Sequence, residues 1–94
     1  MKETIEKINQ AIERCEHQEL AYQVGKIARE KGMSHLADKT GLSRETLYRT
    51  LSRKGNPCLK TVLVVMNELG LKLSCDQSSW PETNKDKENK VNMS

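Results

Sequence analysis

The sequence predicts an all-α domain over residues 1–75, followed by a polar tail over residues 76–94. Apolar residues recur at intervals of three and four along several segments, which is the period of amphipathic helices. Glycines separate these segments at positions where helices commonly end. Charged residues make up 31% of the 94 residues and hydrophobic residues 35%, so the chain can support one small core.

Two amphipathic helices are predicted at the start of the chain, over residues 3–15 and 18–31. The apolar stripe of the first consists of Ile5, Ile8, Ile12 and Cys15, so we expect Cys15 in the core. The second helix repeats the pattern with Leu20, Val24, Ile27 and Ala28. Gly32 is expected to end it, because glycine readily adopts the positive φ found at helix C-termini.

Two short helices are predicted next, over about residues 34–40 and 44–51, with Gly41 in the turn between them. Ser34 and Ser43 are their expected N-caps, because a serine hydroxyl can accept a hydrogen bond from a free amide of the first helical turn. The residues expected to face inward are Leu36, Ala37, Leu47 and Leu51.

A loop over residues 52–57, marked by Gly55 and Pro57, precedes a fifth predicted helix over residues 59–69. The expected inner face of this helix consists of Leu59, Val62, Leu63, Met66 and Leu69, and Gly70 is expected to stop it. Residues 71–75 alternate in polarity, which suggests a short strand. Residues 76–94 hold too few apolar side chains to offset the entropy of ordering, so we expect disorder there.

The composition argues against several classes of protein. Cys15, Cys58 and Cys75 are odd in number and widely spaced, which suits neither a disulfide framework nor a metal site, so we expect a reduced, cytoplasmic compartment. No apolar run reaches about 18 residues and no secretory pattern is visible, so no membrane span or signal peptide is expected. With three aromatic residues and no visible acid–base pair or activated nucleophile, we expect neither an enzyme nor a bound cofactor.

The charges are unevenly distributed along the chain. Residues 1–25 carry three basic and five acidic residues, a net charge of −2, whereas residues 26–60 carry nine basic and three acidic residues, a net charge of +6. A basic block inside a folded segment suggests a polyanionic partner. On charge alone, a solvated helix surface explains the block equally well.

The spacing of the two short helices is typical of a helix-turn-helix over about residues 33–52. Ala37 is small where the second helix crosses the first, and Gly41 supplies the bend. Leu42 fills the corner between the helices. Ser43 caps the second helix and can also donate to a phosphate.

The second short helix would be held on the core by Leu47 and Leu51. This leaves four side chains on the outside, namely Arg44, Glu45, Tyr48 and Arg49. Two helices at roughly 90–120° joined by such a turn present the second one to the major groove of DNA. An ordinary helical hairpin with a glycine corner is the alternative explanation.

The stretch from Leu36 to Leu51 resembles the helix-turn-helix of the Cro/C1 (Xre-like) repressors, which have a lambda repressor-like fold. The resemblance to addiction-module antidote proteins is more specific and covers about residues 3–75. Its features are the Gly32-Met33-Ser34 entry, the run Gly41-Leu42-Ser43-Arg44-Glu45 with Leu47-Tyr48, and the Gly55-Asn56-Pro57 loop. These antidotes are small bacterial and prophage antitoxins.

This resemblance implies a five-helix DNA-binding domain that is usually dimeric. It would bind a double-stranded DNA operator, repress its own operon and neutralise a small protein toxin encoded nearby. A prophage repressor without a toxin partner and a pure protein-interaction module are the alternatives. The fifth helix with residues 71–75, or the first helix, would form the dimer surface, and the sequence does not decide between them.

The resemblance implies that Arg44, Glu45 and Arg49 read base edges. Arginine suits the O6 and N7 atoms of guanine, and Glu45 could accept from N4 of cytosine. Alternatively, Glu45 would hold Arg49 in an ion pair, because the two residues lie four apart on a helix.

Phosphate contacts would position the protein on DNA without specifying the sequence. The candidates are Ser34, Ser43, Arg53, Lys54 and the backbone of Asn56. Many Cro/C1 repressors begin the first motif helix with a DNA-contacting glutamine. This chain departs from that pattern and has Met33 and Ser34 near the position, where Ser34 or His35 could substitute.

Overall fold

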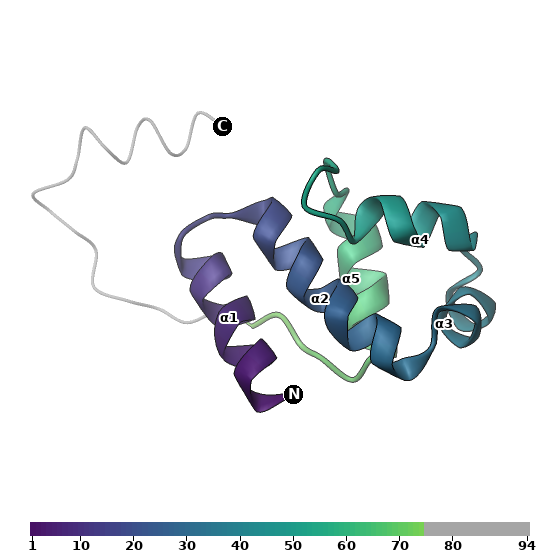
Figure 1. Ribbon diagram of the computed structural model, residues 1–94, viewed down its shortest axis with the longest axis horizontal. Coiled ribbons are helices and arrows are strands. Elements are labelled where there is room, and N and C mark those ends of the chain that lie inside the picture. Colours follow the sequence, from purple (N-terminus) through teal and green to yellow (C-terminus); the bar gives the residue numbers. More distant parts are fainter. Residues whose placement is uncertain (75–94) are drawn as a thin grey trace, which may run out of the picture.

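The computed structural model describes residues 1–74, which form five helices and no strand (Figure 1). The helices are α1 (Lys2–Glu13), α2 (His17–Lys31), α3 (Met33–Thr40), α4 (Arg44–Thr50) and α5 (Leu59–Glu68). The prediction of an all-helical fold with five helices is therefore confirmed. Among these described residues, no helix is both long and apolar enough to cross a membrane.

Helix α2 is the central element of the fold. It contacts α1, α3 and α5, and Figure 1 shows α1 near one end of the molecule with α3 and α4 toward the other. The largest fully buried side chains come from α2 to α5 and from the residue that follows α4; they are Val24, Ile27, Leu36, Leu47, Leu51 and Val65. A single apolar core thus fixes α3 and α4 against α2 and α5.

The predicted apolar stripe of the first helix is partly wrong. Only Ile8 of that stripe is buried, and Ala11 joins it, whereas Ile5 and Ile12 are exposed. The reason is that α1 contacts mainly α2, so only one narrow face of α1 is covered.

The expected burial of Cys15 is also wrong, because Cys15 is exposed in the turn after α1. Helix α1 ends at Glu13, and the chain reverses direction before α2 begins at His17. Cys15 itself adopts a left-handed φ of 59° at this reversal. A residue that belongs to the turn cannot continue the helical stripe.

The predicted inner face of the fifth helix is rotated relative to the observed one. Leu59 and Leu63 are exposed, whereas Val65 is buried. Helix α5 carries apolar side chains around most of its circumference, so spacing alone did not determine which ones face the core. The observed buried set is Val62, Val65, Met66 and Leu69.

The glycine breaks are confirmed by the backbone. Gly32, Gly41 and Gly70 all have positive φ, and Gly41 ends α3 in the left-handed conformation with φ of 75°. The short strand expected over residues 71–75 is absent from residues 71–74, which have no regular structure. Cys75 and the tail over residues 76–94, including their expected disorder, lie outside the described residues.

Candidate nucleic-acid interface

The turn between α3 and α4 is held by hydrogen bonds that its own side chains supply. The hydroxyl of Thr40 donates to the carbonyl oxygen of Leu36 at 2.8 Å and accepts from the amide of Leu42 at 3.3 Å. Leu42 is half-buried and packs against the core, as its corner position predicts. The direction in which α4 leaves the turn is therefore fixed by local bonds and by packing.

Ser43 caps α4 as predicted. Its hydroxyl group accepts from the Thr46 amide at 3.0 Å and donates to the Thr46 hydroxyl oxygen at 2.8 Å. Ser34 does not cap α3, because α3 begins one residue earlier at Met33 and Gly32 occupies the cap position. The expected cap at Ser34 is therefore wrong, and Ser34 is instead an exposed residue of the first turn of α3.

The inner face of α4 is anchored and its outer face is open. Leu47 is completely buried against α2, α3 and α5. Leu51, the residue directly after the helix, is buried in the same core. Four side chains of α4 are exposed, namely Arg44, Glu45, Tyr48 and Arg49. All four are those that the motif places on the outside.

The alternative pairing of Glu45 with Arg49 is not present. Over residues 1–74, the one ion pair joins Glu19 to Arg53. Arg44, Glu45 and Arg49 therefore have no ionic partner within the described part of the chain, and their charged groups are available to a ligand.

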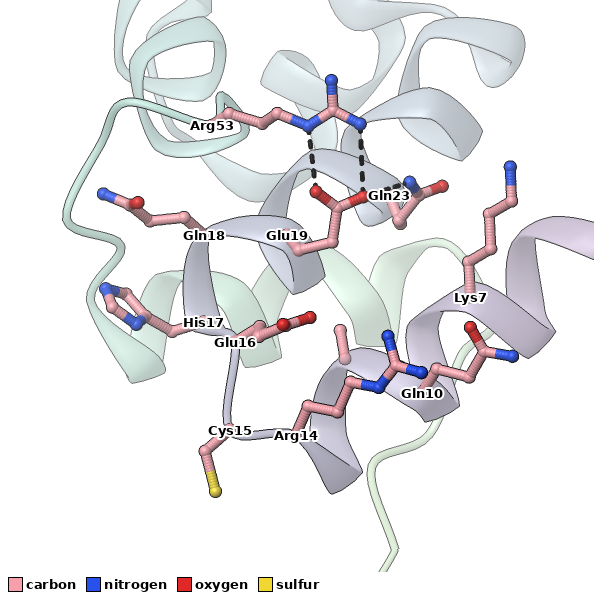
Figure 2. Close-up of a pocket in the computed structure, with 11 residues that line it drawn as sticks. Lys7, Gln10, Arg14, Cys15, Glu16, His17, Gln18, Glu19, Gln23 and Arg53 are labelled. Carbon is pink, nitrogen blue, oxygen red and sulfur yellow. Dashed lines mark hydrogen bonds and ion pairs between the residues drawn. The ribbon is translucent and has the colours of Figure 1, made fainter.

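The guanidinium of Arg53 lies against α2. Its Nε donates to one carboxylate oxygen of Glu19 at 2.9 Å and its Nη2 to the other at 3.2 Å (Figure 2). The guanidinium also stacks 3.7 Å from the ring centre of Tyr22. Its remaining Nη1 points away from Glu19 in Figure 2. Because arginine has five N–H donors, Arg53 can hold this contact and still donate to a phosphate.

Gln23 completes this network from the next turn of α2. Its amide nitrogen donates to Glu19 at 2.6 Å, and it is the one buried polar side chain among the described residues. Hydrogen bonds from Arg53 and then Gln23 are the main causes that lower the pKa of Glu19 to about 2. The network lies at the edge of a polar cleft of about 600 Å³ between α1 and the start of α2 (Figure 2).

The loop after α4 is hydrogen-bonded to α2 and lies close to the end of α4. The side-chain amide of Gln18 donates to the carbonyl oxygen of Gly55 at 2.7 Å. A Cβ atom at Gly55 would lie 2.6 Å from the carbonyl oxygen of Arg49, so only glycine fits this close approach. The loop is thereby fixed next to α4, with Lys54 and Asn56 exposed on it.

The network of Glu19, Gln23 and Arg53 was not predicted from the sequence. The spacing of four between Glu19 and Gln23 is a signal for a contact on one helix face. The contact to Arg53 joins residues 34 apart in the chain, and no local pattern carries it. In contrast, the structure brings Ser43, Arg44, Glu45 and Arg49 together on one short helix, as the motif predicted.

Comparison with known proteins places this arrangement in a family. The family model described as "probable addiction module antidote protein" matches residues 1–77. A Haemophilus influenzae protein described as uncharacterized is 46% identical over 57 residues, which cover 61% of this chain and 59% of the length of that relative. No solved structure matches the chain significantly.

The family match confirms the expected resemblance to addiction-module antidotes, while the relation to Cro/C1 repressors stays a prediction. The match extends through α1 to α5 and all residues of the candidate interface. This chain belongs to the family of probable addiction module antidote proteins.

Proposed function

We propose that this antidote is a sequence-specific DNA-binding protein that represses its own operon as a homodimer and neutralises a small toxin in the cytoplasm. The observation that best supports DNA binding is that α4 has one buried face and one exposed, charged face. Its inner face is locked to the core by Leu47, and its outer face carries charged side chains without ionic partners in residues 1–74. A rigid helix with an open polar face suits the recognition helix of a helix-turn-helix.

Base reading is assigned to Arg44, Glu45 and Arg49. Each arginine would donate in a bidentate manner to O6 and N7 of a guanine, and Glu45 would accept from N4 of a cytosine. A good bidentate contact contributes roughly 1–3 kcal/mol of discrimination against the wrong base. The lack of a Glu45–Arg49 pair supports this assignment, because neither side chain must break an ion pair to reach a base.

Phosphate contacts are assigned to the rim of the same surface. The proposed donors are the side chains of Ser34, Ser43, Arg53 and Lys54 and the backbone amide of Asn56. Ser43 keeps its capping role, and Arg53 would contribute through the nitrogen that Glu19 leaves unused. These contacts would hold α4 in position, so that the base-reading side chains meet the groove in one register.

A homodimer follows from the size of the interface. A single α4 of seven residues reads only about one half-site, and a lone module binds DNA weakly. Two copies related by a two-fold axis would bind a near-palindromic operator with half-sites about one helical turn apart, roughly 34–36 Å. The toxin partner is supported by the family, whose description as an antidote implies a protein to be neutralised.

The base-reading roles can be tested with Arg44→Ala and Arg49→Ala. Each variant is expected to weaken binding to DNA from the protein's own promoter by about 5- to 150-fold, the equivalent of roughly 1–3 kcal/mol. Binding to scrambled DNA should fall much less. The measurement is fluorescence anisotropy on both duplexes at one salt concentration.

Lys54→Ala is the matched control, because it removes a cation from the rim of the surface. It should weaken binding to both duplexes by a similar factor. Equal losses on both duplexes for the Arg44 and Arg49 variants would remove these residues from base reading.

The antitoxin role is tested by expressing the small open reading frame next to the gene, alone and together with this protein. Growth arrest that this protein relieves, with co-purification of the two proteins, is the expected result. A harmless neighbour that does not bind would contradict the antitoxin role and leave a plain repressor.

A further inference from the structure

Helix α5 has an apolar face that residues 1–74 leave uncovered. Leu59 is 62% exposed, Leu63 39% and Val64 37%, although each is a large hydrophobic residue. The exposed residues of α5 form two rows at intervals of four, Leu59, Leu63 and Asn67 in one and Lys60, Val64 and Glu68 in the other. Such rows are the ridges with which one helix packs into the grooves of another.

The charges on this face have no partner within the described part of the chain. Lys60 lies four residues before Val64 and Glu68 four residues after it, so the two are too far apart on the helix to reach each other. The ion pair found in residues 1–74 lies elsewhere, between Glu19 and Arg53. The face therefore carries a positive end, an apolar middle and a negative end.

We propose that this face binds a second copy of the chain, with the two α5 helices antiparallel and a two-fold axis passing next to Val64. Lys60 would then face Glu68 of the partner subunit, and Leu63 would pack against the partner subunit's Val64. The inference rests on the proposed homodimer and names its interface. It places the dimer contact on α5 and not on α1.

The charge pattern selects the antiparallel arrangement. In a parallel pair each Lys60 would face the partner's Lys60 and each Glu68 the partner's Glu68, and both contacts would be repulsive. In the antiparallel pair the two-fold axis turns the same residues into two attractive contacts, about 6 Å along the helix on either side of the axis. A face that is complementary to itself in this way fits an isologous dimer.

The interface would be small. A helix of ten residues is about 15 Å long, so a single pair of such helices buries less than the roughly 1,200 Å² of a stable standard-size interface. The dimer should therefore be weak in free solution and become stable on DNA, where both protomers are held together. The tests accordingly include one that traps a weak dimer.

The first test traps the contact with a disulfide. In a background in which Cys15, Cys58 and Cys75 are replaced by serine, Val64→Cys places a thiol next to the two-fold axis, where the two sulfurs can meet. Mild oxidation should give a covalent dimer. Asn9→Cys, on the exposed side of α1, is the matched control and should stay monomeric under the same oxidation.

The second test reverses the charges and leaves the apolar residues intact. Lys60→Glu and Glu68→Lys should each weaken dimerisation by roughly 5- to 30-fold, because two attractive contacts become repulsive. The double variant restores the attraction with the signs exchanged and should dimerise like the unmodified chain. The measurement is sedimentation equilibrium, with circular dichroism to show that every variant is folded.

The outcomes separate this inference from the function on which it rests. The chain could dimerise while Val64→Cys gives no cross-linked dimer, or while the double variant fails to recover dimerisation. Either result would overturn the α5 interface and leave the proposed homodimer intact. A chain that remains monomeric at every concentration and on operator DNA overturns both. In that case the toxin or residues 75–94 would be the binding partner of the α5 face.

Discussion

Among single residues of the described part of the chain, Glu19 accepts three side-chain hydrogen bonds, two of them from a residue 34 positions away. Its carboxylate accepts from Arg53 at 2.9 and 3.2 Å and from Gln23 at 2.6 Å. These bonds connect α2 with the loop that follows the proposed recognition helix. They also stabilise the charged form of the carboxyl, which is why its pKa falls to about 2 from an ordinary value of 4.5.

This depressed pKa predicts an acid-sensitive contribution to stability. A carboxyl with a lower pKa in the folded state stabilises the fold fully above its ordinary pKa, and this stabilisation is lost as the pH falls from about 5 toward 2. Glu19→Gln cannot form the ion pair, so its melting temperature should lie below that of the unmodified protein at pH 7. The difference should shrink steadily as the pH approaches 2.

Thermal unfolding followed by circular dichroism across this pH range measures the effect. Glu30→Gln is the control, since Glu30 is exposed and has no ion pair with any of residues 1–74, and it should change the melting temperature little. A Glu19→Gln difference that stays constant from pH 7 to pH 2 would contradict the assigned pKa.

At the scale of helices, α2 and the end of α4 approach each other closely at Gly25. Gly25 has no side chain, and a Cβ atom there would lie 2.7 Å from the carbonyl oxygen of Leu51 and 2.9 Å from its Cβ. The glycine lets Leu51 enter the core completely. It thus helps to fix the position of α4, which carries the proposed base-reading residues.

Gly25→Ala is therefore expected to destabilise the protein. Alanine is favoured over glycine inside a helix by about 1 kcal/mol, but the added methyl group collides with backbone that cannot move without shifting α4. Overpacking of this kind costs typically about 1–3 kcal/mol, so the steric effect should be larger than the gain in helix propensity.

Urea unfolding of Gly25→Ala measures the free energy change. Glu30→Ala, on the exposed side of α2, tests helix propensity without the collision and should be close to neutral. A stability of Gly25→Ala above that of the unmodified chain would show that α4 does not depend on this close approach.

At the scale of the whole molecule, the charges are separated along the fold. The acidic first 25 residues include α1, and the basic block over residues 26–60 includes α3, α4 and the loop after α4. In Figure 1, α1 lies toward one end of the molecule and α3 with α4 toward the other. This polarity would steer the proposed DNA-binding surface toward a polyanion.

DNA binding is consequently expected to depend steeply on salt. Of the proposed phosphate contacts, those of Arg53 and Lys54 carry charge, so a dimer would neutralise about four phosphates and lose roughly 10²-fold in affinity between 50 and 200 mM salt. Measured affinities over this range give the slope directly. Lys54→Ala should reduce the magnitude of the slope by about 2 per dimer, whereas a slope near zero would exclude an interface built on phosphate contacts.

Local sequence patterns were sufficient to predict the helical architecture and the core of the motif. The glycine breaks, the Ser43 cap and the inward Leu36, Leu47 and Leu51 are all found in the structure, because local backbone preference and short-range periodicity set these features. The outward position of Arg44, Glu45 and Arg49 follows from the same spacing.

Which apolar faces are covered depends instead on how the helices pack together. Ile5, Ile12, Leu59 and Leu63 have the spacing of core residues but are exposed, because α1 and α5 each meet their neighbours on one side only. The Glu19–Arg53 pair joins residues far apart in the chain, so no local signal could predict it. Periodicity shows that a helix has an apolar face, whereas the packing of the other helices determines which part of that face is buried and which remains for a partner.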